Sequence, residues 1–515
     1  MKFPKACVLS LALVGLASCA ASFRYAPYEC GKLEETPFQD AQTESYRVYG
    51  DCPSLSSSDM AEIPATLGDI YAIGPSKRNV VPSLGKQYLT VIPVDFVDVP
   101  ASQAGENAFG QLKQAFFGDG AFNQYVSLAE YYDKASFHRF QVEGEVTPTA
   151  YRSEESYASL KTKVNASQTK AALTNIYVKA VAWYNNQPFK THELHYGDPV
   201  YFVYLAPYSG MDGGATSRSS MMWAFTINDP APICWSSFYM THPRGDGSVD
   251  AHTFIHEFGH MLGLKDYYDQ SSYAELSPCS PLGRMDMMDC SLGEHNAFSK
   301  AMLGWLRPKV VTGVGEFILR PYSGNGDSLL LPLESYNGTP YDEYVLLEFY
   351  TPSYLNYADA ALRAEAGMTL MKDSGVKAYH VDGRLGCYDD RSKSPRYALT
   401  PSTPVGPYCL DLYCDNSGAP SGGYAHSVRG FLAHSLSPSV PNGELIENFI
   451  ASDHDEDLPY GDKVAHLRNV LYQAGQGEST GLSFHKGGQL PFGFEVTEVT
   501  PTYAKVRTFA NETSA

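Results

Sequence analysis

The sequence predicts an α/β (α+β) domain followed by a β-rich C-terminal module. The first part is inferred from the order of its elements: apolar runs of strand length at 88–94 and 200–206 enclose a segment, 168–185, with apolar residues at helical spacing. The second part is inferred from a change in sequence pattern near residue 313, where short strand-like runs separated by Gly, Pro and Asn begin. A chain of 515 residues, 43% hydrophobic and 18% charged, is long enough for two such units.

The remaining elements of the first part follow in order. Pro93 interrupts the 88–94 run and predicts that this strand lies at a sheet edge or carries a bulge, because proline donates no backbone hydrogen bond. Residues 127–135 have helical spacing, and residues 137–146 alternate as a strand does. The expected amphipathic helix at 168–185 then leads to the strand at 200–206.

The predicted C-terminal module covers residues 313–515. The stretch 383–425 within it is irregular and rich in Pro, Ser and Gly, and no internal repeat is recognisable. The expected short strands are 316–319, 328–333, 343–349, 377–381, 492–499 and 503–509.

The first residues have the composition of an export signal. Two lysines precede a short apolar run at 8–16, which is too short to span a bilayer as a permanent helix. The next four residues, Leu16-Ala17-Ser18-Cys19, resemble a bacterial lipobox. We therefore expect residues 1–18 to be a lipoprotein signal peptide and Cys19 to be lipidated. An ordinary signal peptide whose cleavage site includes a cysteine is the alternative.

These features predict an exported protein that is bound to a membrane. Acyl chains on Cys19 would hold the chain at a membrane surface, as a cell-surface or outer-membrane lipoprotein, with release to the exterior as a variant of this expectation. Residues 19–84 are rich in Ser, Pro, Glu and Thr and are expected to be a linker or pro-segment. The net charge of −19 argues against a nucleic-acid partner, because phosphates would be repelled.

The strongest functional signal is the segment His256-Glu257-Phe258-Gly259-His260. It lies in an expected helix that begins after Asp250, a good N-cap, and ends at Gly263. The two histidines of a helical H-E-x-x-H motif lie one turn apart on one face and can bind the same tetrahedral zinc ion. Glu257 follows the first ligand, and its carboxylate is expected to act as general base and then as general acid. This pattern predicts zinc-dependent hydrolysis of peptide bonds.

Acidic residues after the motif can complete the metal site. Asp266 stands where metzincins have a third histidine and is the expected third ligand. Alternatively, Asp266 accepts a hydrogen bond from a ligand histidine and orients it, or caps the end of the helix, and Asp269 is the nearest rival for the ligand position. His252 precedes His256 by four residues, but it is followed by Thr253, which cannot serve as a base, so we expect a structural role for it.

A methionine-bearing turn follows at Arg284-Met285-Asp286-Met287-Met288-Asp289. Metzincins have such a turn beneath the zinc, where the thioether packs as a floor and does not bind the metal. Met288 is the expected floor, and a role as an ordinary core residue is the alternative. No sequence signal identifies the residue that would stabilise the oxyanion; a Tyr or a His near Met288 is the hypothesis, and His295 is one such residue.

Cysteine usage agrees with export. Without Cys7 and Cys19, eight cysteines remain, and an even number in an exported chain favours disulfides. No CxxC pair occurs, so a thiolate zinc site is not expected. Capping of the zinc by Cys30 or Cys52 in a latent form is a further alternative. The eight are Cys30, Cys52, Cys234, Cys279, Cys290, Cys387, Cys409 and Cys414.

Together these segments resemble the immune inhibitor A family of secreted bacterial metalloendopeptidases. Residues 256–269 are similar to the family's HEFGH-xxG-LPD-xYD core, with Lys265 in place of the usual Pro, and 285–289 to its W-D-L-M-D turn, with Met285 in place of Trp. The helix that ends L-G-W-L in the family resembles 295–306.

The likeness extends outward on both sides of the motif. Glu130-Tyr131-Tyr132 with Ser136-Phe137 resembles the family's YY…SYG element, with His138 in place of the glycine. Similar short motifs occur at 94–96, 344–348 and 379–382, and the resemblance covers roughly residues 86–385.

The resemblance implies a metzincin-like zinc protease domain, which we place at 85–312. It also implies one catalytic zinc, extracellular protein or peptide substrates, an N-terminal pro-segment and frequent calcium sites. Acidic loops at 324–327 and 453–457 offer oxygen ligands for calcium, and solvated acidic loops are the alternative.

Other readings of the sequence compete with a protease. A binding lipoprotein on a protease fold would not need to keep Glu257, and an esterase is disfavoured because no G-x-S-x-G motif is present. Arg244-Gly245-Asp246 is expected to form a turn and not to act as an adhesion site. His380 and Asp382 are expected to be a structural pair and not a second metal site.

Overall fold

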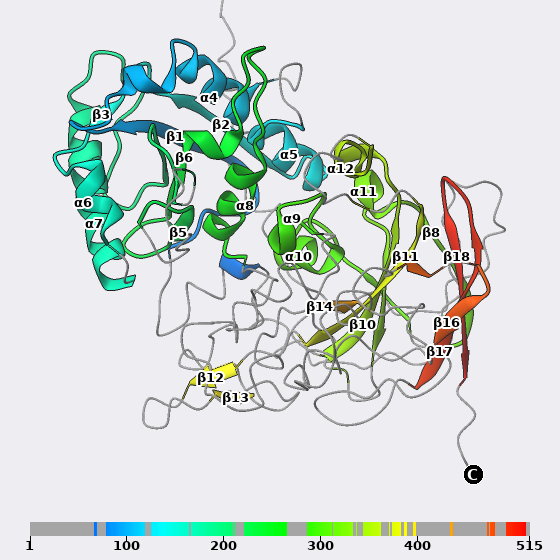
Figure 1. Cartoon of the computed structure of the whole chain (residues 1–515). Helices are drawn as coiled ribbons and strands as arrows, with labels where there is room; N and C mark the ends of the chain where they lie inside the picture. Colours follow the sequence, from blue (N-terminus) through cyan, green and yellow to red (C-terminus); the bar gives the residue numbers. More distant parts are fainter. Residues whose placement is uncertain are drawn as a thin grey trace, which may run out of the picture.

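The computed structural model contains the mixed α and β elements that the sequence predicts (Figure 1). The predicted signal peptide, Cys19 and Asp266 lie outside the residues that it describes. Those residues are 66–68, 79–118, 125–163, 166–209, 211, 221–264, 286–311, 313–332, 336, 343–361, 370, 373–382, 386–388, 395–397, 433–435, 471–472, 474–478 and 491–510.

The first half is built on a mostly parallel sheet of six strands with the order β2-β1-β4-β6-β5, in which β3 pairs with the end of β1. Only β5, at one edge, runs antiparallel to its neighbour β6. The strands are β1 (Gly85–Asp95), β2 (Phe140–Val146), β3 (Tyr151–Arg152), β4 (Val200–Tyr204), β5 (Phe225–Ile227) and β6 (Ile233–Ser237).

Strand β1 lies inside this sheet, so the expectation that Pro93 marks an edge or a bulge is wrong. On one side, β1 pairs with β4, and Pro93 lies within this pairing. On the other side, β1 pairs first with β2, which ends opposite Val91, and then with β3, which begins opposite Val94. The carbonyls of Val91 and Asp95 both accept hydrogen bonds on that second side. The backbone of Pro93 faces the same side, at the gap between β2 and β3. The N–H that proline lacks would have no partner strand there, so no hydrogen bond of the sheet is lost.

Helices cover both faces of the sheet. On one face Ile92 and Val94 of β1 pack against α6 (Tyr157–Lys161) and α7 (Ala166–Asn185). On the other face Leu89 and Val91 belong to the core formed with α4 (Ala108–Phe117), α5 (Leu128–Ala135) and α8 (His252–Met261). The side chains of β1 alternate between the two layers, as the period of two of a strand requires. No helix in the described part of the chain has both the length and the apolar character needed to cross a bilayer.

The turn between α5 and β2 is made without the glycine found in the family motif. Phe137 and His138 adopt φ values of 57° and 63°, which lie in the left-handed region. The imidazole of His138 lies 2.7 Å from a carboxylate oxygen of Asp133, and its backbone N–H donates to the Asp133 carbonyl. These contacts stabilise a backbone conformation that glycine would adopt more easily.

The second half is β-rich and contains two larger sheets with a shared apolar core. One sheet has the order β14-β11-β10-β9-β7, with β15 beside β11, and the other has the order β16-β17-β18-β8. Their strands are β7 (Lys309–Val310), β8 (Gly315–Leu319), β9 (Ser328–Pro332), β10 (Glu343–Tyr350), β11 (Gly375–Asp382), β14 (Ala433–Ser435), β15 (Leu471–Tyr472), β16 (Gln476–Glu478), β17 (Phe492–Val499) and β18 (Ala504–Ala510); β12 (Gly386–Tyr388) and β13 (Pro395–Tyr397) form a separate pair.

Strand β10 connects the two halves. Val345 and Leu347 point into the core between the β-sheets, whereas Tyr344 and Leu346 belong to the same buried cluster as helix α8. Figure 1 places α9 and α10 between α8 and this sheet. The domain division at residue 312 stays a prediction, but the apolar core continues across it. The short helices of this region are α9 (Met287–Cys290), α10 (Ala297–Met302), α11 (Tyr322–Asn325), η3 (Tyr354–Asn356) and α12 (Tyr357–Ala361).

Candidate metal centre

Helix α8 carries the predicted zinc ligands and the predicted base. Its N-cap position is Ala251, one residue after the expected cap, but Asp250 still satisfies the first turn because its carboxylate accepts the N–H of His252 at 2.9 Å. Phe254 and Phe258 are buried in the core below the helix. This packing on an apolar face fixes the rotation of α8 about its axis.

The two motif histidines are oriented by backbone carbonyls. Nδ1 of His256 donates to the carbonyl oxygen of Met287, and Nδ1 of His260 donates to that of Leu264, both at 2.8 Å. Because a carbonyl only accepts, each ring carries a proton on Nδ1, and in the neutral form of the ring the lone pair is then on Nε2. The ring centroids lie 4.9 Å apart with an interplanar angle of 85°. Histidines that bind metals are oriented by such hydrogen bonds from the second ring nitrogen, so this pair fits a zinc ion.

The third ligand stays a prediction. Asp266 and its rival Asp269 lie beyond Leu264, in a stretch that the structure does not describe. Within the described ranges, no three His, Cys, Asp or Glu residues lie together as a metal site would require.

Met288 lies against α8 at Gly259. A β-carbon built on Gly259 would come within 2.6 Å of the Met288 sulfur, so only glycine leaves room for the thioether. Gly259 immediately precedes His260 in the motif. The contact places Met288 beside the motif, where a floor residue would lie; its role as a floor stays a prediction.

Asp286 holds this methionine-bearing turn in place. One of its carboxylate oxygens accepts the N–H of Met288 and the other the N–H of Asn296, both at 2.7 Å. Burial raises the pKa of Asp286 to about 7, although the two backbone N–H groups favour the charged form. This role of Asp286 was not predicted, but an aspartate before two helical methionines is a recognisable N-cap signal.

The predicted base, Glu257, is buried and has a hydrogen-bond donor from the sheet edge. The Thr226 hydroxyl, on β5, lies 2.9 Å from Oε2 of Glu257. This contact was not predicted, because β5 has only three residues and gives no periodic signal.

Cys234 is a buried free thiol, so the expectation of disulfides, drawn from the even number of cysteines, is wrong for this residue. It lies in β6 with its sulfur 3.0 Å from the Thr226 hydroxyl and 3.3 Å from the Glu257 carbonyl oxygen. Burial, and then the charge of Glu257, raise the pKa of Cys234 well above its usual range, so it stays a thiol.

His252 has the structural role that the sequence predicts. Its Nδ1 lies 2.5 Å from a carboxylate oxygen of Asp250 and its Nε2 lies 3.0 Å from one of Asp359, while the ring stacks on Tyr125. Burial lowers the pKa of His252, but the two carboxylates outweigh burial and raise it to about 9. The ring is therefore a buried cation with both nitrogens engaged.

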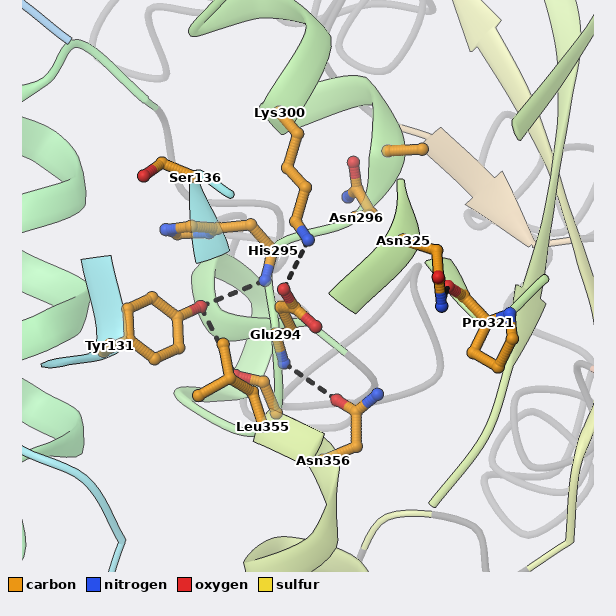
Figure 2. A network of polar contacts seen from close by, with 12 residues as sticks. Tyr131, Ser136, Glu294, His295, Asn296, Lys300, Pro321, Asn325, Leu355 and Asn356 are labelled. Carbon is orange, nitrogen blue, oxygen red and sulfur yellow. Dashed lines mark hydrogen bonds and ion pairs between the residues drawn. The ribbon is translucent and has the colours of Figure 1, made fainter. Parts of the chain in front are cut away.

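His295 belongs to a buried polar network that also contains Tyr131, Glu294 and Lys300 (Figure 2). The backbone N–H of His295 donates to the Tyr131 hydroxyl at 3.0 Å, and Lys300 pairs with Glu294. The His295 side chain has no exposed surface, and burial and Lys300 lower its pKa well below the usual range. A neutral imidazole at such depth does not suit an oxyanion donor that must touch a substrate.

Among the weaker candidates, Asp327 and Asp246 accept local hydrogen bonds. In the calcium candidate loop 324–327, Asp327 accepts hydrogen bonds from the side chain and backbone of Arg320, while the loop 453–457 lies outside the described residues. Asp246 accepts from Ser248 within a turn, as its sequence predicts. The side chains of His380 and Asp382 are not described.

Compared with models of protein families and with curated proteins, the sequence has no match. The chemistry of the site therefore rests on its own residues, above all on two histidines with fixed tautomers beside a buried glutamate.

Proposed function

We propose that the chain is a zinc-dependent metalloendopeptidase that hydrolyses peptide bonds of extracellular proteins. The supporting observation is the pair of hydrogen bonds from Nδ1 of His256 and His260 to backbone carbonyls, which in the neutral form of each ring puts the lone pair on Nε2. Asp266 is the proposed third ligand and Met288 the proposed floor. A metzincin-like fold and kinship with the immune inhibitor A family belong to the same proposal and are supported by the motifs alone.

A zinc ion held by these ligands would supply the Lewis acidity that activates water and polarises the scissile carbonyl. Glu257 then takes a proton from the attacking water and returns it to the leaving amine. Its carboxylate is largely buried, and a site shielded from bulk water strengthens the electrostatic interactions of such a base.

The proposal includes a location at a bacterial surface. Lipid on Cys19 would anchor the enzyme to a membrane facing its protein substrates, and residues 19–84 would act as a linker or a removable pro-segment. N-terminal sequencing and the mass of the mature protein test both points. Calcium remains an expectation taken from the resemblance.

The proposed function is tested with Glu257→Ala. We expect one zinc per chain to be retained and casein cleavage to fall at least about a hundredfold, because a positioned general base contributes on the order of 10² to 10⁴ in rate. Glu143→Ala is the control, because this glutamate is exposed on β2 and pairs only with Lys86 among the contacts described for it. Undiminished cleavage by Glu257→Ala would sink the mechanism.

A binding lipoprotein is the second candidate function. Zinc bound at one per chain, with no cleavage of any protein in a broad panel by the unmodified chain, would favour it over proteolysis. Loss of zinc in His260→Ala is expected under both functions and serves to locate the metal.

A further inference from the structure

We propose that Thr226 is a positioning residue that holds the Glu257 carboxylate in its working orientation through a hydrogen bond to Oε2. The inference deepens the proposed function and rests on it. Thr226 lies in the middle of β5, the antiparallel edge strand, and is in register with Cys234 of β6. Figure 1 shows β5 close to α8, on which Glu257 lies.

Three atoms could accept the single hydroxyl proton of Thr226: two oxygens of Glu257 and the Cys234 sulfur at 3.0 Å, which is a weak acceptor. Its Oγ1 lies 2.9 Å from Oε2 of Glu257 and 2.9 Å from the main-chain oxygen of the same residue. Distance alone therefore does not decide which atom accepts the proton.

The surroundings favour the carboxylate. The Cys234 thiol lies 3.3 Å from the Glu257 carbonyl and can donate to it, so this oxygen has a second available donor. A hydrogen bond to an ionised acceptor is roughly twice as strong as one between neutral groups. We therefore assign the thiol proton to the carbonyl and the Thr226 proton to Oε2.

This bond restricts a side chain with three rotatable bonds. A carboxylate tied at one oxygen keeps the other in a defined direction, which a general base needs if it is to meet its proton at hydrogen-bond distance. The histidines are held separately by the carbonyls of Met287 and Leu264. Loss of the Thr226 hydroxyl should therefore reduce turnover without reducing metal or substrate binding.

The kinetic test compares Thr226→Val, which keeps the side-chain shape, with Thr226→Ser, which keeps the hydroxyl. We expect kcat of Thr226→Val to fall by about tenfold, with KM and zinc affinity unchanged, and Thr226→Ser to recover most of the loss. Ser236→Ala is the control, because this hydroxyl lies in the neighbouring strand and bonds to Tyr201. An unchanged kcat in Thr226→Val, or a parallel loss of zinc affinity, would overturn the assignment.

A thermal double-mutant cycle tests the hydrogen bond without relying on catalysis. In the full chain, Thr226→Val should lower Tm, and this decrease should at least halve in a Glu257→Ala background, since the ionised acceptor is then gone. An equal decrease in both backgrounds would mean that the main-chain oxygen is the acceptor and would refute the inference. The two failures are distinguishable: absence of cleavage by the unmodified chain counts against the proposed function, whereas absence of coupling counts against Thr226.

Discussion

Gly259 is required because Met288 occupies the space that a side chain would fill. A β-carbon at this position would lie 2.6 Å from the Met288 sulfur and 3.3 Å from its methyl carbon. Gly259→Ala must therefore push the methionine turn away from α8. We expect a loss of about 1–3 kcal/mol in the free energy of unfolding, as for other overpacked cores, measured by chemical denaturation.

The same substitution should weaken zinc binding, because the displaced turn carries the Met287 carbonyl that orients His256. Competition with a chelator measures this effect. Gly245→Ala is the matched control, since a β-carbon there meets no atom within 4 Å. Equal stability of the two variants would contradict the packing argument.

Residues of the site differ in how far the sequence could predict them. The spacing of His256 and His260 follows from helical geometry, so their shared face could be predicted. Thr226 could not, because it reaches Glu257 only through the folding of a sheet edge onto α8. The free thiol of Cys234 could not be predicted either, because the number of cysteines does not show which of them the sheet buries without a disulfide partner.

At the scale of elements, His252 connects the start of α8 to α12. The imidazolium lies between Asp250 and Asp359, and the pKa of His252 is about 9 in the folded chain against about 6.5 in an unfolded one. A raised pKa means that the stabilisation is complete below pH 6.5 and is lost as the pH rises through 9. The shift corresponds to roughly 3 kcal/mol.

We therefore expect His252→Gln to remove a decrease in stability that the unmodified chain shows between about pH 6.5 and 9.5. Denaturation midpoints measured across this range in both proteins give the difference. His195→Gln is the control, because this histidine is exposed on a loop. Parallel pH profiles for the unmodified chain and His252→Gln would show that the ring is not a buried cation.

Element prediction succeeded where the periodic signal was long and failed where it was short or depended on partners. The helix expected at 168–185 appears as α7 (Ala166–Asn185), and the strand at 200–206 contains β4. The prediction from Pro93 was wrong because the strand that pairs with β1 changes from β2 to β3 beside this residue, and no local sequence pattern reveals that change. The strands β3 and β5 have only two and three residues, too few for a period to be visible.

Across the whole molecule, a buried carboxylate ties the C-terminal sheet to the helices around the candidate metal centre. Glu348 of β10 accepts the N–H of Ala297 at 2.8 Å and the Tyr379 hydroxyl at 2.8 Å, and it pairs with Lys377 at 3.1 Å. Both members of the ion pair are almost completely buried. The change in sequence pattern near residue 313 could be recognised in the sequence. The apolar core that β10 shares with the helices around the candidate metal centre could not, because it depends on the direction in which alternate side chains of β10 point.

Glu348→Ala tests whether the two halves depend on each other. The variant removes a buried carboxylate from Lys377 and the acceptor of the Ala297 N–H, and breaking a buried ion pair costs about 3–5 kcal/mol. If the halves form one cooperative unit, the free energy of unfolding should fall in a single transition, and zinc should be released at the same denaturant concentration. Glu495→Ala, which loses only the partly exposed pair with Arg507, should change stability by less than about 1 kcal/mol. Two separate transitions, with zinc retained through the first, would instead show that the β-rich half unfolds on its own and that the shared core contributes little to the metal centre.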